Sequence, residues 1–316
     1  MSSSVLPNRL SKSRIQSGRQ CHKRLWLELH QRGAANWGDV AQARLDEGTR
    51  FGELARELLG GGALVAACRA QLDAALRQTE ALLSQPSVSM LFEPAFVHRQ
   101  VAVRVDALRR AADGDVLIEV KSTTQVKPEH LWDCAIQLWV LRGAGRAVKQ
   151  VMLGHIDNRF VYTQQNAYHG LLVLADISEQ VEALLPQIPG MVVTLQKVVI
   201  GPLPAITTGE HCSKPYGCPF FAYCRATEPA AAEFPLTLLP RAGALAASLA
   251  AAGYRDLREV PDSALKNPRH LRILAATRSN RPFVSPEFDA QLSGIAYPRY
   301  YLDFETITHV IPRWLG

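Results

Sequence analysis

Residues 101–121 read VAVRVDALRRAADGDVLIEVK and predict the pair of strands around which the chain is arranged. Val101, Val103 and Val105 alternate with other residues, and successive side chains of a strand point to opposite faces. A strand over this segment therefore packs its valines against a core. Asp106 then lies on the opposite face.

The second half of the stretch, VLIEVK at 116–121, repeats this alternation. It places three apolar side chains on one face of a strand and Glu119 with Lys121 on the other. The connection AADGD at 111–115 is rich in residues that tolerate positive φ, which favours an antiparallel hairpin. The hairpin would bring Asp106 close to Glu119 and Lys121, so that two carboxylates lie beside a cation.

Two converging carboxylates suit Mg²⁺ or Mn²⁺, hard cations that keep several waters and are completed by substrate phosphate oxygens. Lys121 beside them can hold or help to deprotonate an attacking water and offset the charge that develops on a phosphate. This combination predicts metal-assisted hydrolysis of a phosphodiester bond. The alternative from these residues alone is an exposed strand face that carries an ordinary Glu–Lys ion pair.

The next segment, PEHLWDCAIQLWVL at 128–141, has the apolar spacing of a helix that is buried against the hairpin. Leu131, Cys134, Ala135, Leu138 and Leu141 form its apolar face. Asp133 and Gln137 lie one turn apart on another face.

The run from 114 to 141, GDVLIEVKSTTQVKPEHLWDCAIQLWVL, resembles the core of the RecB-like PD-(D/E)xK nucleases. The resemblance implies an α/β fold with a small mixed sheet flanked by helices, and DNA, single-stranded or with free ends, as the substrate. The site residues that it implies are the metal ligands Asp106, Glu119 and the main-chain carbonyl of Val120, the catalytic cation Lys121 and the positioning residue Gln137.

Two family positions differ in this chain. The metal-ligand His that many members carry in an early helix falls on Gly52, with Glu53 as a substitute, and the aromatic residue four positions after Gln137 is Leu141. These differences keep two rival interpretations open. One is a nucleic-acid-binding module with a degenerate nuclease site, and the other is a structural adaptor clipped by a metal.

The six cysteines are better read as ligands or buried thiols than as disulfides. Cys68 and Cys134 occur in apolar helical patterns and are expected in the core. The other four are Cys21 and three in the Pro/Gly-rich segment 201–225, which cannot bury a core of its own. Four thiolates on one metal centre, zinc or an iron–sulfur cluster, would clip the two ends of the first unit together.

One early and three late cysteines resemble the arrangement in the CRISPR-associated and AddB members of the RecB-like families. That resemblance favours a 4Fe–4S cluster, with zinc as the alternative, although the C-x5-C-x5-C spacing here differs from their usual late C-x2-C element. The implied ligands are Cys21, Cys212, Cys218 and Cys224.

Charge and hydropathy indicate the broad class of protein to which the chain belongs. The net charge of +6 and the pI near 9.1 are compatible with a polyanionic partner. No apolar run approaches the length of a membrane span, and the N-terminus lacks the apolar core of a secretory signal. We therefore expect a cytoplasmic protein that does not enter a membrane.

The chain divides into three expected segments. Residues 1–226 form the nuclease module with its cysteine-ligated centre, and 227–295 form a helical linker with the outline of a helix-hairpin-helix. Residues 296–316 resemble the first strand of a DnaQ-like, RNase H-fold exonuclease domain that is truncated here. Asp303 and Glu305 would lie on one face of that strand as the ligands of a second, incomplete metal site.

Local patterns predict further elements outside this core. One or two short helices are expected over 9–31, and single helices over 39–59, 64–84 and 177–187. The expected strands are 148–157 and 160–162.

Overall fold

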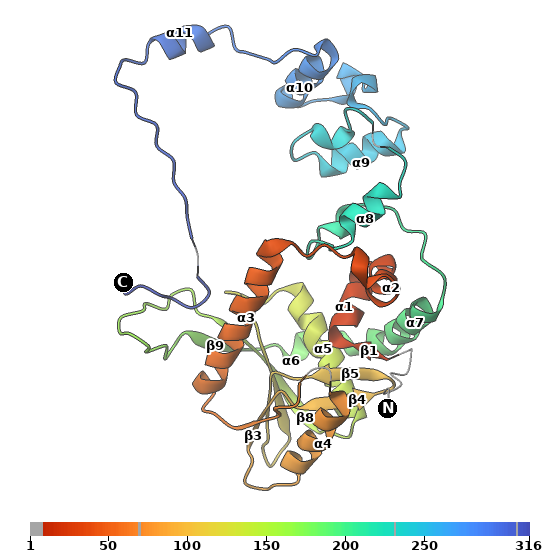
Figure 1. Cartoon of the computed structure of the whole chain (residues 1–316), viewed down its shortest axis with the longest axis vertical. Helices are drawn as coiled ribbons and strands as arrows, with labels where there is room; N and C mark the ends of the chain where they lie inside the picture. The colour runs from red at the N-terminus through yellow and green to blue at the C-terminus, as the bar shows by residue number, and fades with distance from the viewer. Residues whose placement is uncertain (1–8, 69–70, 231, 308) are drawn as a thin grey trace. The chain divides into compact units, whose positions relative to one another are not determined.

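The valine-rich segment after residue 100 forms two short strands in the computed structural model, of which the first, β5, is labelled in Figure 1. β5 (Val101–Arg104) and β6 (Ala107–Arg109) are separated at Val105 and Asp106, so the expectation of one continuous strand is wrong. β6 pairs antiparallel with β7 (Asp115–Val120), and the predicted hairpin is confirmed for this half.

The structure describes residues 9–68, 71–230, 232–307 and 309–316. The chain divides into two compact units, of which the second is Glu228–Ile307. The first unit contains the described residues up to Thr227 together with 309–316.

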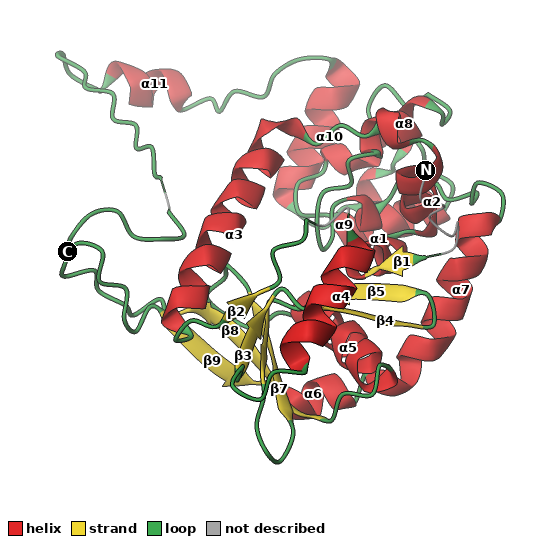
Figure 2. Cartoon of the chain, turned by 60° about the horizontal axis from the view of Figure 1, so that its bottom comes forward, coloured by secondary structure: helices red, strands yellow, loops and turns green. Residues whose placement is uncertain are grey.

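The chain changes sheets at the break between β5 and β6. Figure 2 shows the two sheets, with β5 between β1 and β4 in one, and β7, β8 and β9 in the other. β5 is the central strand of a three-stranded sheet, and β6 belongs to a six-stranded mixed sheet in which β7 and β8 are parallel. This arrangement confirms the general expectation of an α/β fold with mixed sheets flanked by helices. The remaining strands are β1 (Leu10–Ser11), β2 (Ala63–Leu64), β3 (Met90–Phe92), β4 (Ala95–His98), β8 (Val148–Ile156) and β9 (Leu172–Asp176).

The helix α5 (Pro128–Gly143) fills the core and contacts strands of both sheets. Four of the five apolar residues predicted for its buried face are fully buried, and Leu131 packs at the margin of the same core. Ile136 and Val140 are buried as well, so the helix is enclosed on nearly all sides. Such a helix holds any polar side chain on it away from water, which matters for Asp133 and Gln137.

Helices also form near the N-terminus as expected. α1 (Lys12–Gln20) and α2 (His22–His30) are separated by Cys21, and Ser11 caps α1 by accepting a hydrogen bond from the Arg14 N–H. After η1 (Arg32–Ala34), the long α3 (Gly38–Leu58) ends before the three glycines at 60–62, which have positive φ.

The expected helix over 64–84 is confirmed only for α4 (Leu72–Leu83). β2 instead pairs with β3, and the Arg104 guanidinium donates hydrogen bonds to the carbonyls of Val65 at 2.9 Å and Ala67 at 2.6 Å. In a helix these carbonyls would accept hydrogen bonds from the helix backbone. Because Arg104 satisfies them instead, the segment around Val65 and Ala67 can remain extended.

The edge of the large sheet also differs from the prediction. Residues 160–162 form no strand, and β9 pairs with β8 in their place. The expected helix over 177–187 appears as α6 (Ser178–Glu182) and η2 (Leu185–Gln187).

The helical stretch continues into α7 (Ile188–Ile200), so that Ser178–Ile200 is long and apolar enough to cross a membrane by length and composition. Ile188, Val192, Leu195 and Val199 of α7 are buried in the main core. That spacing is typical of a core helix of a globular protein.

The second unit has a small apolar core of its own, which includes Leu236, Leu249, Leu257 and Leu274. Asp303 and Glu305 are exposed, and residues 296–307 pair with no described strand, so the expected strand is not formed. An isolated strand leaves its backbone groups without partners, which makes it unstable alone. The elements of the unit are η4 (Leu236–Leu238), α9 (Gly243–Ala251), η5 (Leu257–Glu259), η6 (Asp262–Ala264), α10 (Pro268–Ser279) and α11 (Phe288–Ser293).

Two helical glycines give opposite expectations for the same substitution. A Cβ at Gly143 in α5 would lie 2.2 Å from the His98 ring, whereas a Cβ at Gly52 in α3 would meet no atom within 4 Å. We expect Gly143→Ala to lower the free energy of unfolding by about 1 to 3 kcal/mol, because the His98 ring, which packs against Trp139, must shift. Gly52→Ala should raise it by about 0.5 to 1 kcal/mol. Urea unfolding followed by circular dichroism measures both, and effects of the same sign would contradict this packing.

Candidate active site

Asp106 lies at the break between the two sheets. It is half-buried, and its Oδ2 accepts a hydrogen bond of 2.7 Å from the main-chain N–H of Val120, at the carboxyl end of β7. The change of sheet therefore places this carboxylate beside the last residues of the neighbouring strand. The hairpin brings Asp106 to Glu119 and Lys121 as the sequence predicts.

Glu119 is the most enclosed charged group of the site, with 1% of its surface exposed. Its Oε1 accepts hydrogen bonds from the Nζ of Lys121 at 2.6 Å and of Lys12 at 2.8 Å. Its Oε2 accepts a hydrogen bond of 2.7 Å from the Nε2 of Gln137, which is fully buried in α5. Gln137 therefore fixes the orientation of the Glu119 carboxylate, which fits the predicted positioning role.

Asp133 and Lys12 complete the cluster, although the sequence assigned neither of them a role. The Lys121 Nζ lies 2.6 Å from Asp133 Oδ2, and the Lys12 Nζ lies 3.4 Å from the same oxygen. Both lysines thus contact the same two carboxylate oxygens, and the four groups form a ring of alternating charge, here called the charge ring. The spacing of Asp133 one turn before Gln137 was a usable signal, but Lys12 is separated from Glu119 by 107 positions.

Burial and neighbouring charges change the acidities in the site. Burial alone would raise the pKa of Glu119, but the ammonium groups of Lys12 and Lys121 outweigh it and hold this pKa well below its usual range. The pKa values of both lysines are raised, because the carboxylates around them outweigh their burial. Both lysines are therefore cations at neutral pH.

The pKa values of the other two carboxyl groups, those of Asp106 and Asp133, are raised. Removal from water, followed by the charge of Glu119, raises the pKa of Asp106 to about 7. Burial also raises the pKa of Asp133. A nearby divalent cation would therefore stabilise the ionised form of Asp106.

The donor set fits a hard divalent cation. Within the described residues, no three His, Cys, Asp or Glu side chains converge closely enough to hold a metal ion by themselves. Mg²⁺ needs only one or two carboxylates, with water and substrate oxygens for the rest, and Asp106 and Glu119 are the carboxylates that would hold it. The buried Oε1 of Gln137 is a further acceptor, and it has no hydrogen-bond partner among the described residues.

A groove of about 850 Å³ opens over the charge ring. The guanidinium of Arg19 lies 3.8 Å from the ring centre of Trp132, which lines the groove with Tyr216. The further basic residues that line it are Arg14, Arg24 and Arg32. Arginines interleaved with aromatic rings are typical of surfaces that bind single-stranded nucleic acid.

Glu53 does not replace the missing helix ligand. It is exposed, lies 3.9 Å from Arg56 and is not among the residues that line the groove. Leu141 is fully buried in the core, so it contacts no ligand.

The four predicted cysteine ligands line one small cavity. Cys21 lies between α1 and α2, and Cys212, Cys218 and Cys224 come from η3 (Glu210–Cys212), a loop and α8 (Phe221–Ala226). Burial raises the pKa of the Cys218 thiol, and the nearby Cys212 and Cys21 act in the same direction. The fold thus brings the four cysteines to one cavity across about 190 positions of chain, but among the described residues no three of their side chains converge closely enough to hold a metal ion.

Side chains of the first two helices hold the cysteine-bearing loop in place. Gln20 donates hydrogen bonds of 2.7 Å to the carbonyls of both His211 and Tyr216, and Trp26 donates one of 2.9 Å to that of Gly201. Of the other two cysteines, Cys134 is buried as predicted, but Cys68 is exposed and that prediction is wrong.

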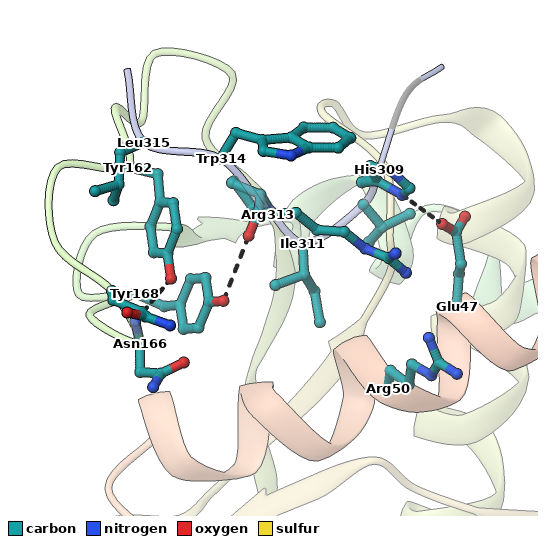
Figure 3. A pocket seen from close by; sticks show the side chains of 13 residues that line it. Glu47, Arg50, Tyr162, Asn166, Tyr168, His309, Ile311, Arg313, Trp314 and Leu315 are labelled. Carbon is teal, nitrogen blue, oxygen red and sulfur yellow. Dashed lines mark hydrogen bonds and ion pairs between the residues drawn. The ribbon is translucent and has the colours of Figure 1, made fainter.

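The first unit contains another pocket, of about 740 Å³, between α3, the loop after β8 and the C-terminal segment (Figure 3). The rings of Tyr162 and Tyr168 stack with centres 5.0 Å apart, and Tyr168 donates a hydrogen bond to the Pro312 carbonyl. His309 lies 3.8 Å from Glu47. This pocket has a single carboxylate among its lining residues and does not resemble a metal-dependent site.

Comparisons with known proteins leave the family of this chain open. No family model matches the sequence, and no curated protein matches it. Nine chains of solved structures match. One, described as the crystal structure of SSO0001, shares 14% sequence identity over 70% of this chain and 88% of that chain, with a TM-score of 0.31.

The raised pKa of Asp106 predicts that the metal-free protein loses stability as the pH rises. The folded protein releases this proton near pH 7 and the unfolded chain near 3.8, so folding favours the protonated form between these values. From about pH 5 to about pH 8, the thermal midpoint in EDTA should fall, and Asp106→Asn should recover about 1 to 3 kcal/mol of the loss. Glu119 stabilises the fold throughout this window, since its contribution is lost only in stronger acid.

Asp113→Asn is the matched control, because Asp113 is exposed and pairs with Lys149 at the other end of β7. It should leave the pH profile of the melting temperature unchanged. Parallel profiles for the wild type and Asp106→Asn would contradict the assignment.

Proposed function

We propose that the first unit is a metal-dependent nuclease of the RecB-like PD-(D/E)xK type, which hydrolyses phosphodiester bonds of DNA. The observation that carries the proposal is the meeting of Asp106, Glu119 and Lys121 below a groove lined with arginines and aromatic rings. In this proposal the enzyme is cytoplasmic, acts in DNA repair, recombination or defence, and binds no membrane.

Each residue has a part in the proposed reaction. Mg²⁺ or Mn²⁺, held by Asp106, Glu119 and the carbonyl of Val120, would polarise the phosphate and activate a water. Lys121 remains protonated, so it offsets the charge that develops on the phosphate rather than removing a proton. Gln137 holds Glu119 in the orientation that a ligand requires.

The groove supports single strands or free ends as the substrate. Guanidinium groups bind backbone phosphates, and the exposed ring of Tyr216 offers a stacking surface for unpaired bases, beside the half-buried Trp132, on which Arg19 lies. Bases in an intact duplex are already stacked on each other, so they gain less from such surfaces. This contrast favours exonuclease action from an end.

A nucleic-acid-binding module with a degenerate site is the second candidate. The absence of a further ligand at Gly52 or Glu53 favours it, as does the charge ring, in which two lysines already balance the carboxylates. Such a module would bind DNA equally well in EDTA and would never cleave it.

We also propose that the four cysteines hold one metal centre that joins α1 and α2 to the 210–224 loop. The resemblance of their arrangement favours a 4Fe–4S cluster. The cavity that the four cysteines line with other residues is only about 10 Å³, and their thiols do not converge closely enough to hold a metal ion as they stand. Zinc, the alternative, would require the four thiols to move closer together. A four-iron cluster would require the loop to open.

Substitution of the site residues tests the nuclease directly. Asp106→Ala, Glu119→Ala and Lys121→Ala should each lower the rate of cleavage of end-labelled single-stranded DNA by about a hundredfold or more. Asp113→Ala and Lys149→Ala, an exposed Asp–Lys pair away from the groove, are matched controls that should keep full activity. Cleavage that continues in EDTA would contradict the proposal, and binding without cleavage would establish the second candidate.

Metal analysis tests the cysteine centre. Anaerobically purified protein should contain either about one zinc or about four irons with broad visible absorbance. Cys21→Ser should lose this metal as completely as Cys218→Ser, although Cys21 lies far from the loop in sequence. Cys68→Ser is the control, because Cys68 is exposed and lies outside the cavity. Full metal content in Cys21→Ser would show that Cys21 is not a ligand.

A further inference from the structure

Lys12 is a buried cation that the nuclease motif does not include. It belongs to the first turn of α1, and its side chain is 18% exposed. Its Nζ lies 2.8 Å from Glu119 Oε1 and 3.4 Å from Asp133 Oδ2, the same two oxygens that Lys121 contacts at 2.6 Å each. The side chain of a proposed metal ligand is therefore already shared by two ammonium groups.

We propose that Lys12 is a positioning residue that takes the place of the divalent cation beside Glu119 and yields this place when the metal binds. The proposal rests on the proposed function of the site. It adds that the N-terminal helix supplies a cation with which the metal must compete.

The hydrogen bonds of Glu119 favour one route for a metal. Its Oε2 accepts a hydrogen bond from Gln137, which is fully buried and does not line the groove, whereas the two lysines at Oε1 do line it. A cation that enters from the groove therefore meets Oε1 first. Oε1 accepts hydrogen bonds from the ammonium groups of both lysines. A divalent ion in contact with this oxygen would therefore lie within a few ångströms of two positive charges. Repulsion at that distance is strong in a buried site, so one lysine has to move.

The distances indicate that Lys12 moves and Lys121 stays. Lys121 has two contacts of 2.6 Å and is fixed at the end of β7, where its N–H donates to the Gly154 carbonyl at 2.8 Å. Lys12 has one short contact and one of 3.4 Å. Both lysines line the groove, so a displaced Lys12 ammonium remains next to a bound phosphate.

This role gives Lys12 two effects of opposite sign. Without metal, Lys12 stabilises the buried carboxylates, so its loss should destabilise the fold. With metal, its loss removes a competitor, so affinity for the metal should rise. An ion pair that only supports the fold predicts destabilisation with unchanged or weaker metal binding.

The test is titration of Mn²⁺ into the full chain by calorimetry, with binding that Glu119→Ala abolishes taken as specific to this site. Lys12→Met should bind Mn²⁺ about tenfold more tightly than the wild type. Its melting temperature should be lower in EDTA and should rise more on addition of Mn²⁺. Lys149→Met, which removes an exposed lysine paired with Asp113, should change neither quantity.

Acetylation of the wild-type protein gives a second measurement that does not depend on the folding of a variant. Mn²⁺ should increase the acetylation of Lys12 several-fold, as quantified by mass spectrometry, because the metal releases its amine from Glu119. Lys121 should change much less.

The outcomes separate the two proposals. If the wild type shows no Mn²⁺ binding that depends on Glu119, the metal site of the proposed nuclease is refuted. If that binding is present but is no tighter in Lys12→Met, and Lys12 labelling does not respond to Mn²⁺, the role of Lys12 alone is overturned.

Discussion

A buried carboxylate needs compensation, and Glu119 imposes this requirement on the rest of the first unit. Removing a charge from water costs several kcal/mol unless partners replace the lost hydration. The partners of Glu119 come from three places in the fold: α1 supplies Lys12, the residue directly after β7 is Lys121, and α5 supplies Gln137. The positions of these elements are therefore coupled through one side chain. A shift of any one of them would leave a charge or an amide unpaired inside the protein.

The same helix links the charge ring to the cysteine cavity. α1 begins with Lys12 in the ring and ends with Gln20, which holds the loop that carries Cys212 and Cys218. Ordering of that loop by a metal would also order Tyr216, which lines the groove. The proposed metal centre, the groove and the proposed catalytic residues thus depend on one short helix that the fold places between them.

Sequence reasoning succeeded where the signal was local. Strand alternation and helical spacing give the β6–β7 hairpin, α5 and the approach of Asp106 to Glu119, whereas the place of Gln137 in the site came from the family resemblance. It failed where a distant partner decides the outcome. Alternation continues unchanged through the break before Asp106, so it cannot reveal a change of sheet. Residues 160–162 and β9 are similar short apolar runs, and only β9 has a strand to pair with. Lys12 carries no local pattern at all, because its partner is brought to it only by the fold.

The charge ring also determines how strong the electric field of the site is at a distance. When both carboxylates are ionised, its two positive and two negative charges cancel and alternate around a small circuit. Such an electrical quadrupole has a field that falls off much more steeply than that of a single charge, and screening by salt shortens it further. A polyanion approaching the groove therefore responds to the arginines along the walls rather than to the ring at the floor. In the proposed nuclease, ionic strength would therefore affect capture of a nucleic-acid strand by the arginines more than it affects the groups of the charge ring.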